Sequence, residues 1–280
     1  MKLLKSADDL GSFVLQKRQK GLSVGFVPTM GALHQGHISL LEKSRADNDI
    51  SICSIYVNPT QFNNPDDFKK YPKTIENDID LLEKWGCDVL FLPETNEVYT
   101  KEFVINQYNL GYLESMLEGK YRPGHFQGVC QVVHRLLQIV KPDKLYLGRK
   151  DYQQCMVISK LIELKEINTE VVICPTLREA DGLAMSSRNL RLNETQRSKA
   201  VQIFKTMQMI KNEIIPGHLS HLKQKAVDIL SDAGFRVDYV EIADAGSLEP
   251  IIEWNGQQKA VILVAAYLDD IRLIDNLVIN

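Results

Sequence analysis

The sequence predicts an α/β protein in which helices wind around a parallel sheet, followed by a smaller α+β domain. Over the first two-thirds of the 280 residues, short apolar and β-branched runs alternate with longer stretches of helical spacing. Such alternation is typical of parallel strands joined by crossover helices. In the last third the pattern changes, and two helical stretches are followed by two strand-like runs. We therefore expect two domains.

The first domain is expected to alternate strands and helices from residue 22 onward. Residues 50–57 are a β-branched run that Asn58 and Pro59 end, which is typical of a buried strand. Residues 75–85 have helical spacing, and Gly86 follows them as a stop signal. The expected strands are residues 22–27, 50–57, 89–92, 144–147 and 170–174. The expected helices are residues 38–47, 75–85, 129–140 and 152–165.

The second domain is expected to follow the loop of residues 174–193, which contains Pro175 and Gly182. Its expected helices are residues 194–213 and 219–233. Its expected strands are residues 237–243 and 260–268. The predicted domains are residues 1–176 and residues 177–280.

The composition is that of a globular protein, with 44% hydrophobic and 25% charged residues. A formal net charge of −3 argues against broad binding to nucleic acid, so no nucleic-acid partner is expected. The five cysteines include no CxxC pair and mostly lie in apolar runs, which favours buried reduced thiols. Neither a signal-peptide pattern nor a run of about 20 apolar residues is present. We therefore expect a cytoplasmic protein without a membrane partner.

The segment after the first strand carries the strongest chemical signal, and it reads PTMGALHQGH over residues 28–37. A strand, a glycine-bearing turn and a helix start form an anion site, because the first helical turn offers free backbone N–H groups. His34 and His37 are three residues apart, so both rings point to one face of that turn. Gly36 between them lets a ligand approach the backbone. Imidazoles there can stabilise the charge that develops on a leaving pyrophosphate.

Spacing alone leaves two other interpretations of these histidines open. The first is a purely structural pair: His218 and His221 repeat the spacing without a preceding strand or a glycine between them, and we expect them to be exposed near a helix start. The second is a zinc site, which would need a third protein ligand such as His125 or Asp151. The spacing favours neither residue as that ligand.

Several further motifs stand in the order found in one enzyme family. They are HQGH at residues 34–37, NPTQF at 58–62, YPKT at 71–74, RPGHF at 122–126, GRKDYQQ at 148–154, MSSRN at 185–189 and LIDN at 273–276. With these motifs along nearly the whole chain, the sequence resembles the pantothenate synthetase family, within the HIGH-type nucleotidyltransferase superfamily. The HQGH segment is the HxGH form of that superfamily's signature.

The resemblance implies a pantoate–β-alanine ligase that condenses (R)-pantoate with β-alanine and forms pantothenate, AMP and pyrophosphate. It implies a pantoyl-adenylate intermediate, ATP as a substrate and Mg²⁺ that is carried mainly by the ATP phosphates. The implied fold is a Rossmann-like N-terminal domain with a smaller C-terminal lid domain, in a homodimer. The implied partners are the small molecules pantoate, β-alanine and ATP.

The resemblance also implies the residues of the site. The implied ATP-binding residues are Met30, Gly31, Ala32, Leu33, His34, Gln35, Gly36, His37, Gly148, Arg149, Lys150, Asp151, Leu177, Met185, Ser186, Ser187 and Arg188. The residues implied for pantoate and β-alanine are Gln61, Gln154 and Asn58, and the implied catalytic residues are His37, His34 and Lys150. Tyr71, Lys73 and Arg188 are further candidates for holding the β-alanine carboxylate or closing the cleft.

Residue chemistry agrees with these assignments. Amide side chains such as Gln61 both donate and accept, which suits hydroxyl groups, while Lys150 and Arg188 suit phosphate oxygens. Arg149 stands where the family usually has Glu, which reverses the charge beside Lys150. The expected catalysis uses positioning and electrostatics, with a mobile loop around Met185 closing over the intermediate.

Two rival functions stay open at this stage. A cytidylyltransferase would share the HxGH segment but would not need the amide block of residues 58–61. A noncatalytic nucleotide-binding or RNA-associated protein would show no turnover, and the acidic balance of the chain disfavours RNA.

Overall fold

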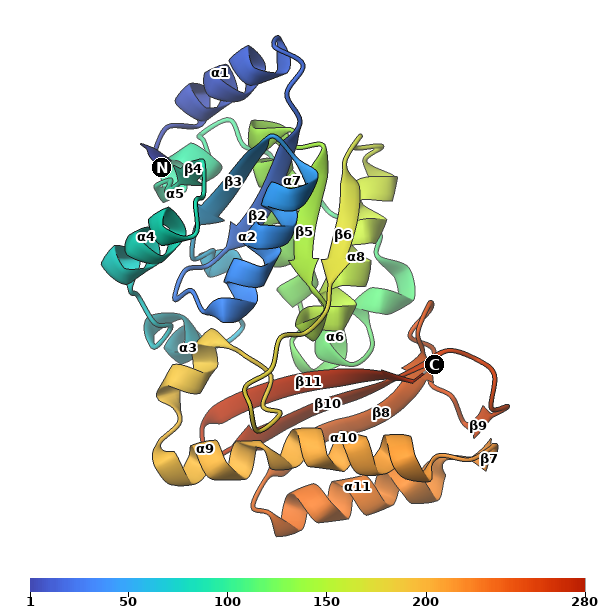
Figure 1. Cartoon of the computed structure of the whole chain (residues 1–280). Coiled ribbons are helices and arrows are strands. Elements are labelled where there is room, and N and C mark those ends of the chain that lie inside the picture. Colours follow the sequence, from blue (N-terminus) through green and yellow to red (C-terminus); the bar gives the residue numbers. More distant parts are fainter. Residues whose placement is uncertain (280) are drawn as a thin grey trace. The chain divides into compact units, whose positions relative to one another are not determined.

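The computed structural model describes residues 1–279, which divide into two compact units (Figure 1). The first unit comprises Met1–Arg149 and Gln153–Pro175. The second comprises Lys150–Tyr152 together with the chain from Thr176 onward. A three-residue segment therefore belongs to a different unit from the residues on either side of it. The division into domains of residues 1–176 and 177–280 stays a prediction.

The first unit is built on a parallel six-stranded sheet with the order β1-β4-β3-β2-β5-β6. Its strands are β1 (Lys2–Leu4), β2 (Val24–Thr29), β3 (Ile50–Ile55), β4 (Val89–Phe91), β5 (Lys144–Gly148) and β6 (Glu170–Cys174). Every strand predicted in this part of the chain is confirmed, and so is the Rossmann-like α/β class. The short β1 was not predicted, because three residues carry no readable periodicity.

The strand order reverses at β2, with β3 and β4 on one side and β5 and β6 on the other. In open parallel sheets, ligands bind beyond the carboxyl ends of the strands at such a reversal. The segments that follow β2 and β5 therefore lie where this fold class forms its binding sites.

Helices cover both faces of the sheet, with α2 in front and α7 behind in Figure 1. The helices of the first part of the chain are α1 (Ala7–Arg18), α2 (Gln35–Asp47), α3 (Pro65–Lys69), α4 (Ile75–Lys84), α5 (Thr95–Val98), α6 (Glu118–Tyr121), α7 (His125–Val140) and α8 (Tyr152–Leu164). The predicted helices are confirmed, but α2 and α7 begin earlier than expected, and α1 and the short helices α3, α5 and α6 were not predicted. Within residues 1–279 no helix is long and apolar enough to cross a membrane.

Two apolar clusters sandwich the sheet. On one face, α2 and α4 pack against strand residues that include Val27, Cys53 and Leu90. On the other face, α1, α7 and α8 pack against residues that include Phe26 and Ile52. The neighbours Phe26 and Val27 fall in different clusters, because successive strand residues point to opposite faces. Burial on both faces explains why these strands are continuous apolar runs in the sequence.

Helix α2 lies close to β2 because Gly25 has no side chain. A Cβ at Gly25 would lie 2.2 Å from Oγ of Ser44 on α2. Ser44 Oγ in turn lies 2.7 Å from Ser51 Oγ on β3, so this close approach satisfies both buried hydroxyls. The contact fixes α2 against the sheet and therefore fixes its N-terminus beyond the end of β2.

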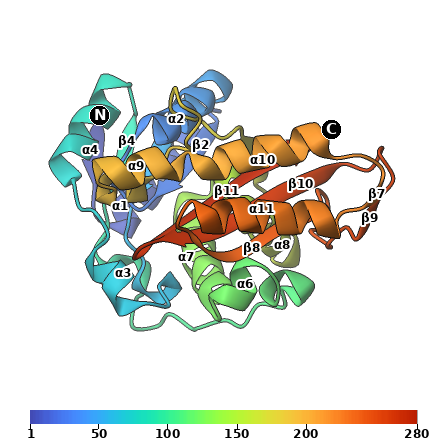
Figure 2. The same cartoon turned by 90° about the horizontal axis from the view of Figure 1, so that it is seen from below.

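The second unit contains an antiparallel sheet with the order β11-β10-β8, against which α10 and α11 lie side by side (Figure 2). Its elements are α9 (Glu194–Ala200), α10 (Gln202–Glu213), β7 (Gly217–His218), α11 (Ser220–Asp232), β8 (Arg236–Asp244), β9 (Glu253–Trp254), β10 (Ala260–Leu268) and β11 (Ile271–Ile279). Met207, Leu230, Ile242 and Ile262 are among the residues of its core. The predicted α+β character of this part is confirmed.

Several details of the second unit differ from the expectations, among them the short strands β7 and β9, which were not predicted. The single helix predicted over residues 194–213 was wrong, because α9 ends at Ala200 and α10 begins at Gln202. No glycine or proline marks the break, so the helical spacing continues across it. Strand β11 was not predicted, since polar residues such as Asp275 and Asn276 interrupt its apolar pattern. All five cysteines are buried free thiols, as expected.

Candidate functional site

The turn between β2 and α2 is held in a strained conformation. Gly31 has a φ of 79°, which favours glycine, and Ala32 has a φ of 49°, which is unusual for a residue with a side chain. Thr29 Oγ1 donates to Ser54 O at 2.8 Å and accepts from the Gly31 N–H at 3.2 Å. A backbone in this conformation persists only where its surroundings over-determine it.

A buried carboxylate that sequence reasoning missed holds this turn. Asp78 on α4 is 2% exposed, and its two oxygens accept from the Ala32 N–H at 2.9 Å and the Leu33 N–H at 2.8 Å. Thr74 Oγ1 also donates to it, at 3.1 Å. The sequence did contain a signal, because Asp78 lies four residues before the buried Leu82 and so shares the inward face of α4. A carboxylate on a buried helix face needs a partner, and here the partner is the turn.

His34 and His37 form a reciprocal cap at the start of α2. Nδ1 of His34 accepts from the Gly36 N–H at 3.1 Å, and Nδ1 of His37 accepts from the His34 N–H at 3.3 Å. The ring centroids are 4.1 Å apart. A neutral imidazole carries one proton, so a ring whose Nδ1 accepts must carry that proton on Nε2. Both rings are therefore fixed as Nε2–H donors at a helix N-terminus.

The second histidine pair has a different environment. His218 lies on the short strand β7 with its Nε2 3.9 Å from Glu253, and His221 lies in the first turn of α11. Both are exposed, as expected. The same HxxH spacing thus yields a double cap at the start of α2 but not at the start of α11.

Asn58 and Gln61 follow the carboxyl end of β3, in the turn that includes η1 (Pro59–Gln61). Both are buried, at 1% and 9% exposure. Asn58 Nδ2 donates to Gln61 Oε1 and to Gly128 O, each at 3.1 Å. Asn58 Oδ1 accepts from Tyr99 OH at 2.9 Å. Both ends of the Asn58 amide are therefore engaged by protein groups.

Gln61 is brought against the turn after β2. Its Nε2 lies 3.3 Å from Sδ of Met30, while its Oε1 accepts from Asn58. Gln61, predicted to bind pantoate, and Met30, predicted to bind ATP, are thus in contact within the first unit. The contact orients the Gln61 amide, because its oxygen and nitrogen face different partners.

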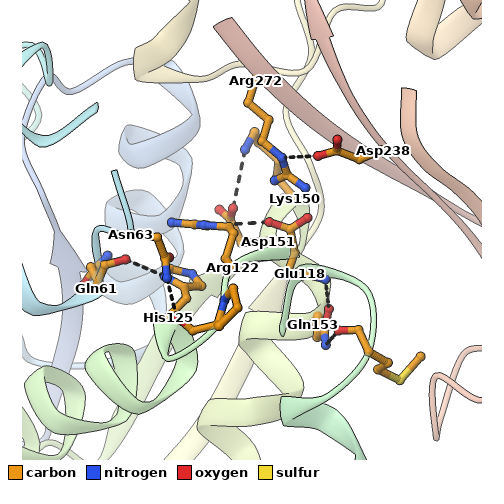
Figure 3. A network of polar contacts seen from close by, with 12 residues as sticks. Gln61, Asn63, Glu118, Arg122, His125, Lys150, Asp151, Gln153, Asp238 and Arg272 are labelled. Atoms are coloured by element: carbon orange, nitrogen blue, oxygen red, sulfur yellow. Dashed lines mark hydrogen bonds and ion pairs between the residues drawn. The ribbon is translucent and has the colours of Figure 1, made fainter. Parts of the chain in front are cut away.

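The RPGHF segment supports the turn after β3, which contains Gln61, from the side of α7. His125 Nδ1 lies 2.7 Å from Gln61 O, and Asn63 Nδ2 donates to Pro123 O, as Figure 3 shows. Gly128 on α7 allows the close approach, since a Cβ there would lie 2.4 Å from Thr60 O. This segment therefore supports the backbone at Gln61.

Of the two adjacent glutamines at the start of α8, one is structural. Gln153 Nε2 donates to Leu113 O at 2.8 Å and Met116 O at 3.0 Å, and its Oε1 accepts from the Glu118 N–H at 3.0 Å. Gln154, the residue predicted for pantoate, is half-buried. The commitment of Gln153 to the protein interior leaves Gln154 as the one of the pair suited to a ligand.

The segment after β5 is divided between the two units. Gly148 and Arg149 belong to the first unit, whereas Lys150 and Asp151 belong to the second. Lys150 Nζ lies 3.5 Å from Asp151 Oδ1 (Figure 3). Within the second unit, Asn276 Nδ2 donates to Lys150 O at 2.7 Å. The lysine predicted to be catalytic is therefore anchored through its backbone to β11.

The MSSR segment begins at the end of a small hairpin over residues 177–185. The Met185 N–H donates to Leu177 O at 3.0 Å, and the Glu179 N–H donates to Leu183 O at 2.8 Å. Ser186 then caps the short helix η4 (Ser187–Arg191) by accepting from the Arg188 N–H. Ser187 is buried, and Met185 and Arg188 are half-buried.

The predicted site residues thus form two groups, one on each unit. The first unit brings together Met30, Gly31, Ala32, Leu33, His34, Gln35, Gly36, His37, Asn58 and Gln61 around the ends of β2 and β3. The second unit carries Lys150, Asp151, Leu177, Met185, Ser186, Ser187 and Arg188. Tyr71 and Lys73 lie in the first unit, the former buried and the latter exposed. Within residues 1–279 no group of three or more His, Cys, Asp or Glu side chains is arranged to hold a metal ion.

Comparison with known proteins gives one consistent family. The family model described as pantoate-beta-alanine ligase matches residues 2–278. The pantothenate synthetase of Azobacteroides pseudotrichonymphae is 43% identical over 279 residues, with 99% of each chain covered. That of Cytophaga hutchinsonii is 42% identical over 281 residues, covering 99% of this chain and 98% of the relative.

Solved structures agree with the sequence comparison. A crystal structure of pantothenate synthetase from Thermus thermophilus matches with a TM-score of 0.90 at 36% identity, covering 99% of each chain. A pantoate-beta-alanine ligase from Francisella tularensis, complexed with beta-gamma ATP and beta-alanine, matches with a TM-score of 0.83 at 38% identity. That match covers 99% of this chain and 97% of the Francisella chain.

Proposed function

Because the chain belongs to the pantoate–β-alanine ligase family and is an ATP-dependent ligase of pantoate and β-alanine, we propose that it works in two steps through pantoyl adenylate. In the first step a pantoate carboxylate oxygen attacks the α-phosphorus of ATP, and pyrophosphate leaves. In the second step the β-alanine amine attacks the acyl carbon, a C–N bond forms and AMP leaves. The amine proton passes to solvent.

The observation that carries the proposal is the double histidine cap. His34 and His37 accept backbone N–H groups at Nδ1, so each presents a proton on Nε2. Two such donors at a helix N-terminus form an electropositive site without any change in protonation. We assign them to the α- and β-phosphate oxygens, where they stabilise the charge that grows as pyrophosphate leaves.

We assign the pantoate hydroxyls to Gln61 and Gln154. Gln61 is held by Asn58 and Met30, so its amide is oriented before any substrate arrives. Asn58 is assigned to orienting Gln61, because its Nδ2 already donates to both Gln61 Oε1 and Gly128 O and its Oδ1 accepts from Tyr99 OH. This replaces the direct substrate contact that the resemblance implied for Asn58.

We assign the triphosphate to the basic and hydroxyl groups of the second unit. Lys150, Ser186, Ser187 and Arg188 supply ammonium, hydroxyl and guanidinium donors, which suit phosphate oxygens. Leu177 is assigned to the adenine through its backbone. Mg²⁺ in nucleotide sites is usually bound by phosphate oxygens, water and one or two carboxylates. The four side chains named above offer no carboxylate, so they are compatible with an ion that is carried mainly by the ATP phosphates. When bound, the ion would neutralise charge on the phosphates.

We further propose a cytoplasmic homodimer that acts on small molecules, without a nucleic-acid or membrane partner. Buried free thiols support the location, since they are typical of proteins kept in a reducing compartment. The part from residue 177 is proposed to act as a lid that excludes water from the acyl adenylate.

The test is isotope exchange between pyrophosphate and ATP, measured beside AMP release. Exchange is expected to require pantoate and not β-alanine, whereas AMP release requires both. Exchange that proceeds without pantoate, or turnover with CTP and a phosphorylated alcohol in place of ATP and pantoate, would overturn the proposal.

A further inference from the structure

Two consecutive polar residues, Asp275 and Asn276, lie buried near the middle of strand β11. Asp275 and Asn276 are 5% and 3% exposed, and they pair in register with Val264 and Leu263 of β10. Burying polar side chains in a sheet costs free energy unless each finds hydrogen-bond partners. The side-chain partners of Asp275 and Asn276 include Arg178 and Lys150, which both lie in the second unit.

Asp275 is bound by Arg178 in a bidentate pair. Arg178 Nη1 lies 2.6 Å from Oδ2 and Nη2 lies 3.0 Å from Oδ1. The guanidinium carbon also sits 4.2 Å from the centre of the Phe204 ring. Burial raises the pKa of Asp275, while Arg178 and the Asn276 N–H lower it, so the ionised carboxylate depends on these partners.

Arg178 in turn closes the hairpin that leads into the MSSR segment. It bridges to Ala184 across the hairpin, and its Nη1 donates to Gly182 O at 3.1 Å. Gly182 has a φ of 96°, and a Cβ there would lie 2.2 Å from the Phe204 ring. Arg178 therefore fixes the hairpin against β11. Its bridge partner Ala184 directly precedes the MSSR segment.

Asn276 reaches a second phosphate-binding segment. Its Nδ2 donates to Lys150 O at 2.7 Å, across 126 positions of the sequence. Its carbonyl accepts from Arg178 Nη2 at 3.1 Å, and its N–H donates to Asp275 Oδ1 at 2.7 Å. One dipeptide thus holds both the backbone of Lys150 and the hairpin before Met185.

We propose that Asp275 and Asn276 are positioning residues that set the distance between Lys150 and the MSSR segment, and so match the second unit to the polyphosphate of ATP. The proposal rests on the proposed function, which assigns both segments to phosphate. Neither residue touches substrate. A buried ion pair contributes little net stability compared with apolar packing, so fixing a geometry is the stronger reason for this one.

The test compares the affinities of ATP and AMP, because AMP lacks the β- and γ-phosphates. Asn276→Leu removes the donor to Lys150 O at nearly constant shape, and Asp275→Asn removes the charge that holds Arg178. Displacement of a binding group by about 1 Å is costly, so ATP affinity should fall by about tenfold or more in both variants. AMP affinity, measured by titration calorimetry without pantoate, should change by less than about twofold, because the proposal places the shifted donors on the β- and γ-phosphates, which AMP lacks.

The matched control is Asp181→Asn. Asp181 lies in the same hairpin and also makes a bidentate pair, with Arg197, at 2.7 and 3.1 Å, but this pair is exposed and does not involve β11. Exposed ion pairs contribute little, so ATP affinity should stay within about twofold of wild type. An equal loss of ATP and AMP affinity in Asn276→Leu, or no loss of ATP affinity, would overturn the positioning role.

The outcomes separate this proposal from the proposed function. Asn276→Leu keeps the test decisive if Asp275→Asn fails to fold. A wild-type protein without pantoate-dependent exchange would refute the proposed function alone. The ratio of ATP to AMP affinity in the variants would still decide whether the dipeptide positions the phosphate groups.

Discussion

At the scale of single residues, the turn between β2 and α2 uses each histidine twice. Nδ1 of each ring completes the cap of α2, and this leaves the proton of each ring on Nε2. Asp78 holds the backbone just before this cap through two N–H groups. Capping and the proposed contact with phosphate can therefore be tested one at a time by substitution.

The first prediction separates the two functions of His34. Asn is among the best N-cap residues, so His34→Asn should keep the helix cap, with a change in unfolding free energy below about 0.5 kcal/mol. It lacks the Nε2–H donor, so pantoate-dependent exchange should fall about 100- to 1000-fold. His34→Ala should lose the same activity and also about 1 kcal/mol of stability. His221→Ala, at the exposed pair, is the control, and normal exchange in His34→Asn would refute the assignment.

The second prediction concerns Asp78. Asp78→Asn replaces one acceptor by an NH₂ group, so one buried N–H of the turn loses its partner, at a cost of about 1–3 kcal/mol. Displacement of the turn should also slow adenylation by about tenfold or more. Asp80→Asn, on the exposed face of the same helix, should stay within about 0.5 kcal/mol of wild type. Denaturant unfolding and exchange rates measure both effects, and equal behaviour of the two variants would contradict the role of Asp78.

At the scale of elements, the site depends on how closely secondary structures approach one another. Helix α2 approaches β2 at Gly25, and α7 approaches η1 at Gly128. In both places a glycine faces another element with no room for a Cβ. The second approach bears on the proposed pantoate contact, because η1 ends at Gln61.

The third prediction tests this approach with a pair of helix glycines. In Gly128→Ala the new Cβ would lie 2.4 Å from Thr60 O and 2.8 Å from Gln61 Cα, both backbone atoms. The variant should lose about 1–3 kcal/mol of stability, and its KM for pantoate should rise more than its KM for ATP. Gly11→Ala in α1 meets nothing within 4 Å and should gain about 0.5–1 kcal/mol. A Gly128→Ala enzyme with an unchanged KM for pantoate would contradict the support of Gln61 by α7.

Prediction of the elements from sequence succeeded where the local signal was strong. The strands β2, β3 and β4 of the parallel sheet were found because burial on both faces makes them largely continuous apolar runs. Strand β1 was missed because it is too short to show a period. Helix α9 was predicted as one helix with α10, because no glycine or proline separates them. Strand β11 was missed because Asp275 and Asn276 look like surface residues until Arg178 and Lys150 are brought to them.

At the scale of the whole molecule, stability has a component that depends on the buried thiols. Burial raises the pKa of Cys87 and of Cys130 to about 12, from an ordinary value of 9.0. The folded protein therefore keeps these protons when the unfolded chain loses them. The resulting stability is fully present below pH 9.0 and is lost as the pH rises toward 12.

The fourth prediction follows from this linkage. Between pH 9 and 12, each of the two thiols should lower the free energy of unfolding by about 1.4 kcal/mol per pH unit. A thiol reagent should label the native protein slowly near neutral pH and label all five cysteines after unfolding in denaturant. Rapid labelling of Cys87 or Cys130 in the native protein would show that their burial is wrong.

The sequence by itself determined the α/β class, the alternation of strands and helices, and the motifs that indicate the ligase family. These features are local, because they depend on periodicity and on residues adjacent in the chain. Only the tertiary structure decided that Asp78 holds the histidine turn, that Asn58 orients Gln61, and that Asp275 and Asn276 anchor two distant segments. Each depends on a hydrogen bond between residues far apart in the sequence, or on which of several neighbours a side chain bonds to. Neither produces a periodic pattern in the sequence.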